Sequence, residues 1–246
     1  MTAPVLQLQD LAVGHGGRPV LQHLALSLQP GRWMALVGAN ASGKSTLLQT
    51  IAGRLPPIAG RIVIEGTGLA ASGAGNVSLP GYALPADELP AFLILRQAID
   101  IFIEAHGLAS MPAEVEALAR GFGLDAHRDT LIRHASLGTR QKLSVVLALA
   151  RSPRLLLLDE VFNGLDHASA AVLRRWLRRH VEQQQLSIVL ATHGLDVVLQ
   201  CCDEVALVDP GIEGLRRWEV EPFRGADAIE ALQEALAGAS RAPAGG

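Results

Sequence analysis

The chain has 246 residues, 49% of them hydrophobic, and a net charge of −3, which suits one large α/β domain with a substantial core. Its longest apolar runs, such as Val145–Ala150, are far shorter than the roughly 18–20 residues of a membrane-spanning helix. The first residues lack a signal-peptide pattern, so a cytoplasmic protein is expected. The acidic balance argues against a nucleic-acid partner. The adjacent Cys201 and Cys202 lack metal-ligand and redox spacing and are expected to be buried thiols.

The first thirty residues predict a small antiparallel subdomain. Short apolar stretches at Val5–Leu8, Leu11–Val13 and Val20–Leu28 are typical of strands. The sequence Gly-His-Gly-Gly-Arg-Pro at 14–19 separates the last two and predicts a turn.

The clearest motif is the stretch Gly38–Thr46. Its sequence, Gly-Ala-Asn-Ala-Ser-Gly-Lys-Ser-Thr, fits the phosphate-binding pattern Gly-x4-Gly-Lys-Ser/Thr. A buried strand is predicted at Arg32–Val37 before it and a helix at Lys44–Ala52 after it, ended by Gly53. Because glycines let backbone N–H groups and the positive helix start approach phosphates closely, the chain is predicted to bind ATP or a similar triphosphate.

The residues of this loop have separate expected roles. Lys44 is expected to bring a positive charge to the terminal phosphates and to assist catalysis, and the Ser45 hydroxyl is expected to ligate Mg²⁺. The other nucleotide contacts are assigned to Gly38, Asn40, Ser42, Gly43 and Thr46.

The middle of the chain changes from strands to helices. A strand at Arg61–Glu65, a Gly/Ala/Ser-rich loop at 66–76 and a strand-like stretch at Asn76–Leu84 precede the change. From about 87 to 150 helical periodicity dominates, which predicts a helical lobe inserted in the core. Its expected helices are Ala91–His106, Pro112–Phe122 and Thr139–Ala150.

The remainder returns to alternating strands and helices, which favours a mostly parallel sheet. The expected strands are 154–159, 186–191, 204–208 and 215–220, and the expected helices are 169–184, 195–202 and 226–237. The predicted fold is therefore α/β, a P-loop NTPase core with an N-terminal antiparallel subdomain and an inserted lobe. It forms one domain over 1–238, with a disordered Ala/Gly/Pro tail at 239–246.

The strand at Leu155–Leu158 ends in two carboxylates, Asp159 and Glu160. The carboxyl ends of parallel strands are where α/β proteins bind ligands. Asp159 is expected to hold Mg²⁺, directly or through water. Glu160 is expected to orient or deprotonate an attacking water.

The sequence at 135–142, Ala-Ser-Leu-Gly-Thr-Arg-Gln-Lys, opens the last helix of the lobe. With the phosphate loop and the acidic strand, the chain resembles the ATP-binding subunit of an ABC transporter over roughly residues 4–220. At this point in the chain, members of that family carry the signature Leu-Ser-Gly-Gly-Gln. Ser136 and Gly138 match its Ser and second Gly. The variant departs at Ala135, Leu137 and Thr139, and is similar to that of many exporter-type subunits.

A Ser hydroxyl and free N–H groups at a helix start form an anion site. The resemblance implies that Ser136 and Gly138 meet the γ-phosphate held by the opposite subunit; an ordinary Ser-capped helix is the alternative. The sequence at 163–166, Asn-Gly-Leu-Asp, resembles the family's D-loop at the dimer interface. His193 resembles the switch histidine, which implies a contact with the γ-phosphate and help to Glu160.

Two positions depart from the family pattern. His15 stands where an aromatic residue usually stacks on adenine, and either a base platform or a plain turn residue fits it. Ala86 stands where the family has a Gln that reaches Mg²⁺ and the water. Either Asp87 or a water takes its place, or coupling runs without this contact.

The apolar segments Phe92–Leu95 and Ile99–Ile103 suit either a groove for a transmembrane subunit or packing within the lobe. The resemblance implies an ATPase that closes as a dimer, with an identical copy expected, and drives a transmembrane partner, expected to be an exporter. The protein is then peripheral on the cytoplasmic face of the membrane. The alternatives are a non-transport ATP switch and a weakly hydrolysing regulatory protein.

Overall fold

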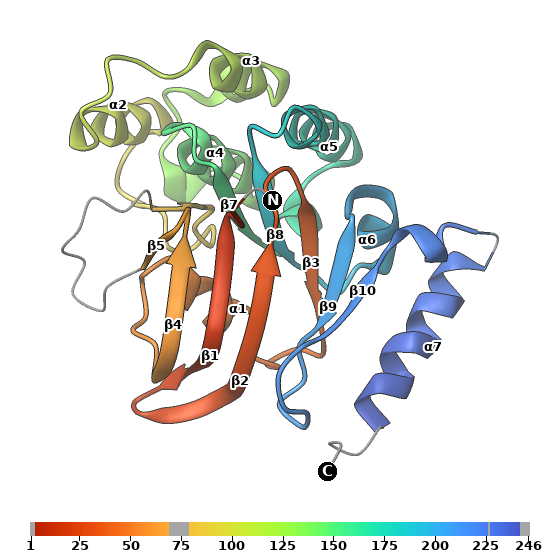
Figure 1. The fold of residues 1–246 in the computed structure, drawn as a ribbon. Coiled ribbons are helices and arrows are strands. Elements are labelled where there is room, and N and C mark those ends of the chain that lie inside the picture. Colours follow the sequence, from red (N-terminus) through yellow and green to blue (C-terminus); the bar gives the residue numbers. More distant parts are fainter. Residues whose placement is uncertain (1–2, 69–78, 226, 242–246) are drawn as a thin grey trace.

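The structure, a computed structural model, describes residues 3–68, 79–225 and 227–241. In this part of the chain two β-sheets lie beside a group of helices (Figure 1). The larger sheet has the strand order β10-β9-β3-β8-β7-β6, and all neighbours pair in parallel except β10 and β9. Its strands are Trp33–Val37 (β3), Gly81–Tyr82 (β6), Leu155–Asp159 (β7), Ser187–Ala191 (β8), Glu204–Leu207 (β9) and Arg216–Glu219 (β10).

The central strands of this sheet are buried on both faces. Along β3, Met34 and Leu36 pack into one hydrophobic core, and Trp33, Ala35 and Val37 pack into a second one. This follows from the alternation of side chains along a strand. The first core lies against the small sheet and the second against the helices, which confirms the predicted α/β layering.

The small sheet is antiparallel, with the strand order β2-β1-β4-β5. Its strands are Leu6–His15 (β1), Arg18–Leu28 (β2), Ala59–Ile64 (β4) and Thr67–Gly68 (β5). The apolar stretches Val5–Leu8 and Leu11–Val13 belong to one strand with a bulge between them, because the register shifts there and Asp10 has a φ of 46°. The turn between β1 and β2 uses Gly16 and Gly17, both with positive φ.

The helix α1, Lys44–Ile51, contacts β1 of the small sheet and β7 and β8 of the larger one. Figure 1 shows it behind the small sheet. Its buried Leu47, Leu48 and Ile51 join the core that both sheets share. The start of this helix, and the loop before it, are therefore fixed by packing on two sides.

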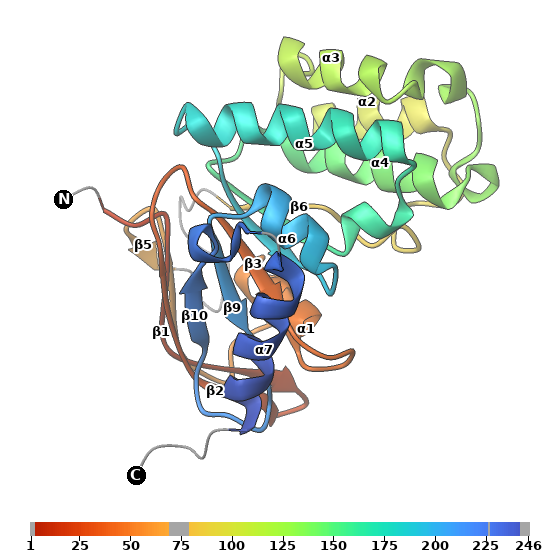
Figure 2. The ribbon, with the colours of Figure 1, turned by 90° about the vertical axis from the view of Figure 1, so that its right-hand side faces the viewer.

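Three helices lie between β6 and β7 in the chain, in the region predicted as a helical lobe. They are Leu95–Ala105 (α2), Ala113–Gly121 (α3) and Leu137–Leu149 (α4), with 3-10 turns at Leu124–His127 and Ile132–His134. Figure 2 shows them, together with α5 (His167–Glu182), as a layer apart from the small sheet. Trp176 of α5 donates from Nε1 to the carbonyl of Glu114 in α3 at 3.2 Å, which ties the lobe to the core.

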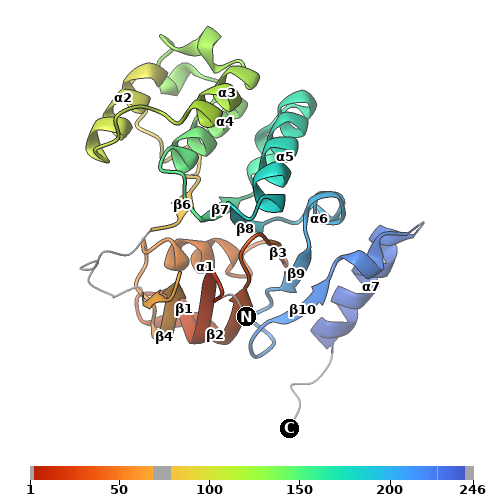
Figure 3. The ribbon, with the colours of Figure 1, turned by 45° about the horizontal axis from the view of Figure 1, so that its top comes forward.

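Two predicted element boundaries are wrong. α2 begins at Leu95 and not at Ala91, because Ile94 forms a β-bridge with Leu131 and its N–H is bonded by Gln97. α7, Ala228–Arg241, extends into the stretch predicted as a tail at 239–246, and it lies along one edge of the molecule in Figure 3. Residues 242–246, and most of the predicted loop at 66–76, lie outside the described residues.

The helix α6, Leu195–Cys201, ends at the two cysteines, which are buried free thiols as predicted. Burial raises the pKa of Cys201 to about 11 and that of Cys202 well above its ordinary value. Both groups are therefore held as neutral thiols, which are poor nucleophiles.

Candidate functional site

The phosphate loop runs from the end of β3 to the start of α1. A Cβ on Gly38 would lie 2.2 Å from the carbonyl oxygen of Val208, so no larger residue fits there. Gly43 has a φ of 100° and packs against the Leu21 side chain, and it opens the helix at Lys44. Both ends of the loop therefore pack closely against neighbouring residues, while Asn40 at its tip is exposed.

The Lys44 side chain lies inside this loop. It is 6% exposed, and its Nζ donates to the carbonyl oxygens of Gly38 and Ala39, both at 2.9 Å. The Ser42 hydroxyl is buried and has no hydrogen-bond partner in the described part of the chain. A buried polar group without a partner is costly, so this hydroxyl is available to an anion entering the loop.

Asp159 at the end of β7 and Ser45 at the start of α1 come together. The Ser45 side chain lies close enough to the Asp159 carboxylate to influence its pKa. Burial raises the pKa of Asp159, and the nearby Ser45 hydroxyl and the Lys44 charge oppose that rise. Mg²⁺ takes oxygen ligands and is commonly held by one carboxylate together with substrate phosphates. The two side chains therefore fit the predicted Mg²⁺ site.

Glu160, directly after β7, is placed by an unusual backbone. Its φ is 49°, and its N–H bonds to the carbonyl of Ala191 at the end of β8. A non-glycine residue in the left-handed region is uncommon and often marks a functional position. Here the turn directs the carboxylate toward the loop that follows β8.

The carboxylate of Glu160 is bonded on both oxygens. His193 Nδ1 lies 3.0 Å from Oε1, and Asn163 Nδ2 donates to Oε2 at 2.9 Å. Glu160 and His193 are far apart in sequence and meet because β7 and β8 are neighbours. The sequence reasoning placed Asn163 at a dimer interface and missed this contact, although a spacing of three residues in a 3-10 turn is a usable signal.

Ser136 and Gly138 lie at the start of α4. The Ser136 Oγ accepts the N–H of Thr139 at 3.1 Å and caps the helix. A Cβ on Gly138 would lie 2.8 Å from the carbonyl oxygen of Gly164, so the loop after Glu160 packs on this helix start. In the described part of the chain neither residue is hydrogen-bonded to the phosphate loop. Within one chain the start of α4 and the phosphate loop are therefore not linked by a hydrogen bond.

The loop after Glu160 is also fixed at its far end. Asp166 caps α5 through the N–H and hydroxyl of Ser169 and pairs with Lys142 of α4 at 2.9 Å. These contacts hold the pKa of Asp166 far below its usual range. α4, the 163–166 loop and Glu160 therefore form one connected unit.

His15 and Ala86, the two positions that depart from the family pattern, differ in their exposure and in their neighbours. His15 is exposed, and its Nε2 lies 3.2 Å from the Thr46 hydroxyl, so it stands beside the phosphate loop. Ala86 is 8% exposed, Asp87 is exposed, and Glu88 pairs with Arg54 at 2.6 Å. A base platform at His15 and a replacement ligand at Asp87 stay predictions.

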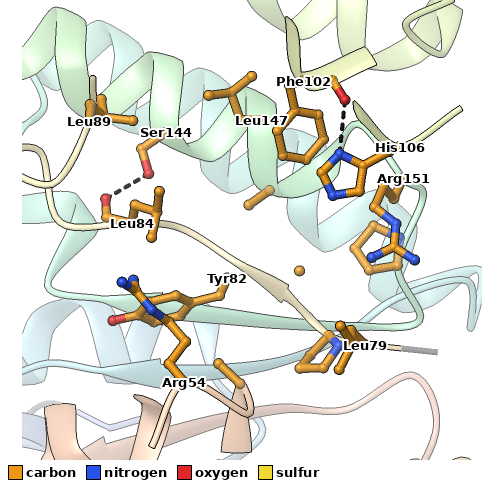
Figure 4. A pocket seen from close by; sticks show the side chains of 15 residues that line it. Arg54, Leu79, Tyr82, Leu84, Leu89, Phe102, His106, Ser144, Leu147 and Arg151 are labelled. Carbon is orange, nitrogen blue, oxygen red and sulfur yellow. Dashed lines mark hydrogen bonds between the residues drawn. The ribbon is translucent and has the colours of Figure 1, made fainter. Parts of the chain in front are cut away.

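A groove of about 250 Å³ lies between the lobe and the sheet (Figure 4). Its lining is mostly apolar and includes Leu79, Leu84, Leu89, Phe102 and Leu147. Polar groups are also present, and Figure 4 shows His106 and Arg151 close together at one end. The apolar segment predicted as a partner surface is split, because Phe102 lines this groove and Phe92 is 75% exposed outside it.

No helix in residues 3–68, 79–225 and 227–241 has the length and apolarity to span a bilayer. The chain is similar to several curated ATP-binding proteins. The methionine import ATP-binding protein MetN of Caulobacter vibrioides is 30% identical over 215 residues, which cover 84% of this chain and 65% of MetN. The taurine import ATP-binding protein TauB of Escherichia coli strain 536 is 28% identical, over 84% of this chain and 80% of TauB.

A solved structure of the ATP binding subunit of an ABC transporter matches with a TM-score of 0.80 and 28% identity, over 95% of this chain and 99% of that one. A family model described as ABC transporter matches residues 21–163, more than half of the chain. The matched segment contains the phosphate loop, the Ser136 helix start and the acidic strand. The chain therefore belongs to the ABC transporter family, as one of its ATP-binding subunits with a P-loop ATPase fold.

Proposed function

We propose that the chain hydrolyses MgATP in a site completed by a second ATP-binding subunit, and that this cycle drives a transmembrane partner. One observation carries the proposal. Glu160, with both carboxylate oxygens bonded by His193 and Asn163, directly follows Asp159. An oriented carboxylate next to a metal-binding carboxylate is what phosphoryl transfer to water requires.

The reaction proposed is in-line attack of water on the γ-phosphorus of ATP. The water oxygen bonds to phosphorus, its proton moves to Glu160, and the bond to the β-phosphate oxygen breaks as ADP leaves with the electron pair. His193 holds Glu160 through Nδ1, which leaves Nε2 for the γ-phosphate. Asn163 keeps the second carboxylate oxygen in place.

The phosphates are held by the loop amides, Ser42 and Lys44. On binding, the Lys44 ammonium exchanges the carbonyls of Gly38 and Ala39 for phosphate oxygens. Ser45 and Asp159 would hold Mg²⁺, which when bound neutralises charge on the β- and γ-phosphates. His15, beside Thr46, is proposed as the surface on which the adenine lies.

The second subunit, proposed as an identical copy, supplies Ser136 and Gly138. In one chain these residues do not reach the phosphate loop, and Ser136 is exposed at the start of α4. An exposed helix start with a hydroxyl suits a phosphate brought by another chain. Closure on ATP and opening after hydrolysis would then supply the movement.

The groove of Figure 4 is proposed as the contact with the transmembrane subunit. An amphipathic helix with an apolar face fits its lining, and an acidic residue on that helix would complement Arg151 and His106. Such a contact would place the protein on the cytoplasmic face of the membrane. The direction of transport expected from the 135–142 sequence, export, stays a prediction; MetN and TauB are both named for import.

The test of hydrolysis is Glu160→Gln. Gln keeps the shape and can accept one hydrogen bond, but it cannot take a proton, so turnover should fall by about 100-fold or more. ATP affinity should stay within about twofold, because the phosphate loop is untouched. Steady-state phosphate release and equilibrium ATP titration measure the two quantities. Substantial turnover in this variant would refute the assignment.

A further inference from the structure

We propose that Thr139 is a positioning residue that makes the Ser136 hydroxyl a hydrogen-bond donor to phosphate. The inference rests on the proposed function, in which the start of α4 meets the γ-phosphate held by a second subunit. It concerns a residue that departs from the signature pattern. It follows from the hydrogen bonds that surround Ser136.

The hydroxyl of Thr139 lies on the protein side of the Ser136 hydroxyl. Thr139 is 7% exposed, whereas Ser136 is exposed at the helix start. Their Oγ atoms are 2.9 Å apart, and the N–H of Thr139 also reaches the Ser136 Oγ at 3.1 Å. Thr139 therefore approaches Ser136 from the protein side with both its backbone and its side chain.

A serine hydroxyl has one proton to donate and two lone pairs that accept. The N–H of Thr139 occupies one lone pair. If the Thr139 hydroxyl donates to the other, the Ser136 proton is left to point outward, away from Thr139. If Ser136 donates to Thr139 instead, its outward side carries only a lone pair, which repels an anion.

A phosphate oxygen accepts hydrogen bonds and does not donate them. An anion at this helix start therefore selects the first arrangement, with Thr139 as donor to Ser136 and Ser136 as donor to phosphate. Each hydroxyl in such a chain polarises the next, which strengthens the outer bond. Thr139 acts through Ser136 and is not itself in contact with the nucleotide.

The test uses the Glu160→Gln chain, which holds ATP without turnover. Thr139→Val keeps the shape of the side chain and removes its hydroxyl, while Thr139→Ser keeps the hydroxyl. A closed homodimer contains two such contacts, and one hydrogen bond is worth a factor of about 3 to 10. The ATP-dependent dimerisation constant, measured by sedimentation, should fall about 10- to 100-fold in Thr139→Val. It should stay within about threefold in Thr139→Ser.

Two further measurements distinguish the loss of the Thr139–Ser136 hydrogen bond from a general loss of protein stability. ATP affinity of the monomeric Thr139→Val chain should be unchanged, because in the described part of the chain neither Ser136 nor Thr139 is hydrogen-bonded to its own phosphate loop. Ser187→Ala is the matched control, since the buried Ser187 hydroxyl accepts the N–H of Gly31 at 3.0 Å in the core. This control should lower thermal stability and leave the dimerisation constant unchanged.

The outcomes distinguish this inference from the proposal beneath it. If Glu160→Gln forms no dimer with ATP, the shared site and the role of Thr139 both fail. If it dimerises and Thr139→Val dimerises equally well, only the role of Thr139 fails. An equal loss in Thr139→Val and Thr139→Ser also overturns it, because the hydroxyl would then not be the active group.

Discussion

At the level of single residues, Asp159 combines a functional position with an unfavourable environment. Its carboxylate is partly buried between β7 and α1, and this burial raises its pKa. A raised pKa in the folded state means that folding favours the protonated form. At neutral pH the ionised carboxylate therefore costs stability, and Mg²⁺ with ATP would remove that cost when bound.

We predict that Asp159→Asn raises the thermal midpoint of the nucleotide-free protein at pH 7 and weakens MgATP binding. The gain should shrink toward acid pH, because protonation of Asp159 below both its folded and unfolded pKa removes the charge from the wild type as well. Thermal unfolding from pH 4 to pH 8 measures this. A gain that is the same at every pH would contradict the explanation.

Asn163 gives a second prediction at this scale. Asn163→Ala removes the bond to Glu160 Oε2 and leaves the carboxylate held only by His193. Turnover should fall about 5- to 10-fold, as expected for the loss of orientation of a general base, with ATP affinity unchanged. Turnover should fall further in Asn163→Asp, since this substitution places a second negative charge beside the Glu160 carboxylate. A wild-type turnover rate in Asn163→Ala would show that the Asn163–Glu160 bond does not contribute to catalysis.

At the level of elements, the short strand β6 is fixed by a close approach to α4. A Cβ on Gly81 would lie 2.4 Å from the carbonyl oxygen of Ala148 and 2.7 Å from Pro153. Because backbone atoms cannot turn aside as a side chain does, the contact requires glycine. This approach sets the position of α4, and with it Ser136, relative to the sheet.

Gly81→Ala is therefore predicted to lower the free energy of unfolding by about 1–3 kcal/mol, the usual range for overpacking. The matched control is Gly238→Ala in α7, an exposed helix position where a Cβ meets no atom within 4 Å. That variant should be neutral or stabilised by up to about 1 kcal/mol through helix propensity. Urea unfolding measures both, and equal effects would contradict the steric explanation.

One set of contacts between the lobe and the core lies on α5. The rings of Trp176 and His180 stack at 3.7 Å, and both residues bond Glu114 of α3. His180 Nδ1 also lies 2.8 Å from the carbonyl of Trp176. These contacts hold α3 against α5.

At the level of the whole molecule, the groove extends from the helical lobe to the residues that follow α1. Tyr82 and Leu84 line the groove. Arg54, shortly after the end of α1 at Ile51, lies over the Tyr82 ring. Burial raises the pKa of Tyr82 to about 12, so it stays a neutral ring under the Arg54 guanidinium. A helix docked in the groove would thus touch residues close to the end of α1.

We predict that Leu79→Asp abolishes docking of the transmembrane partner. Leu79 is 45% exposed and lines the groove, so a charge there opposes an apolar helix without disturbing the core. Recovery of the native transmembrane subunit with the tagged chain should fall at least about tenfold, with ATP binding retained. Ile229→Asp, at 46% exposure on α7, is the control and should dock normally. An equal loss in both variants would contradict the assignment of the groove.

The sequence by itself determined the layered α/β fold and the family. The Gly38–Thr46 loop, the apolar strand before Asp159 and the helix start at Ser136 can be identified because each function depends on backbone groups and on residues close in sequence. The boundaries of α2 and α7 were wrong because they depend on contacts made by the folded chain, such as the Ile94 bridge to Leu131.

Only the tertiary structure decided how these pieces meet. The pairing of β7 with β8 brings His193 to Glu160, and the packing of Gly164 on Gly138 joins the acidic strand to α4. The spacing of three residues makes the contacts of Asn163 with Glu160 and of Thr139 with Ser136 possible, and the side-chain conformations in the folded chain decide whether they form. Distant residues become neighbours through strand order and close packing, and neither is written in a local pattern.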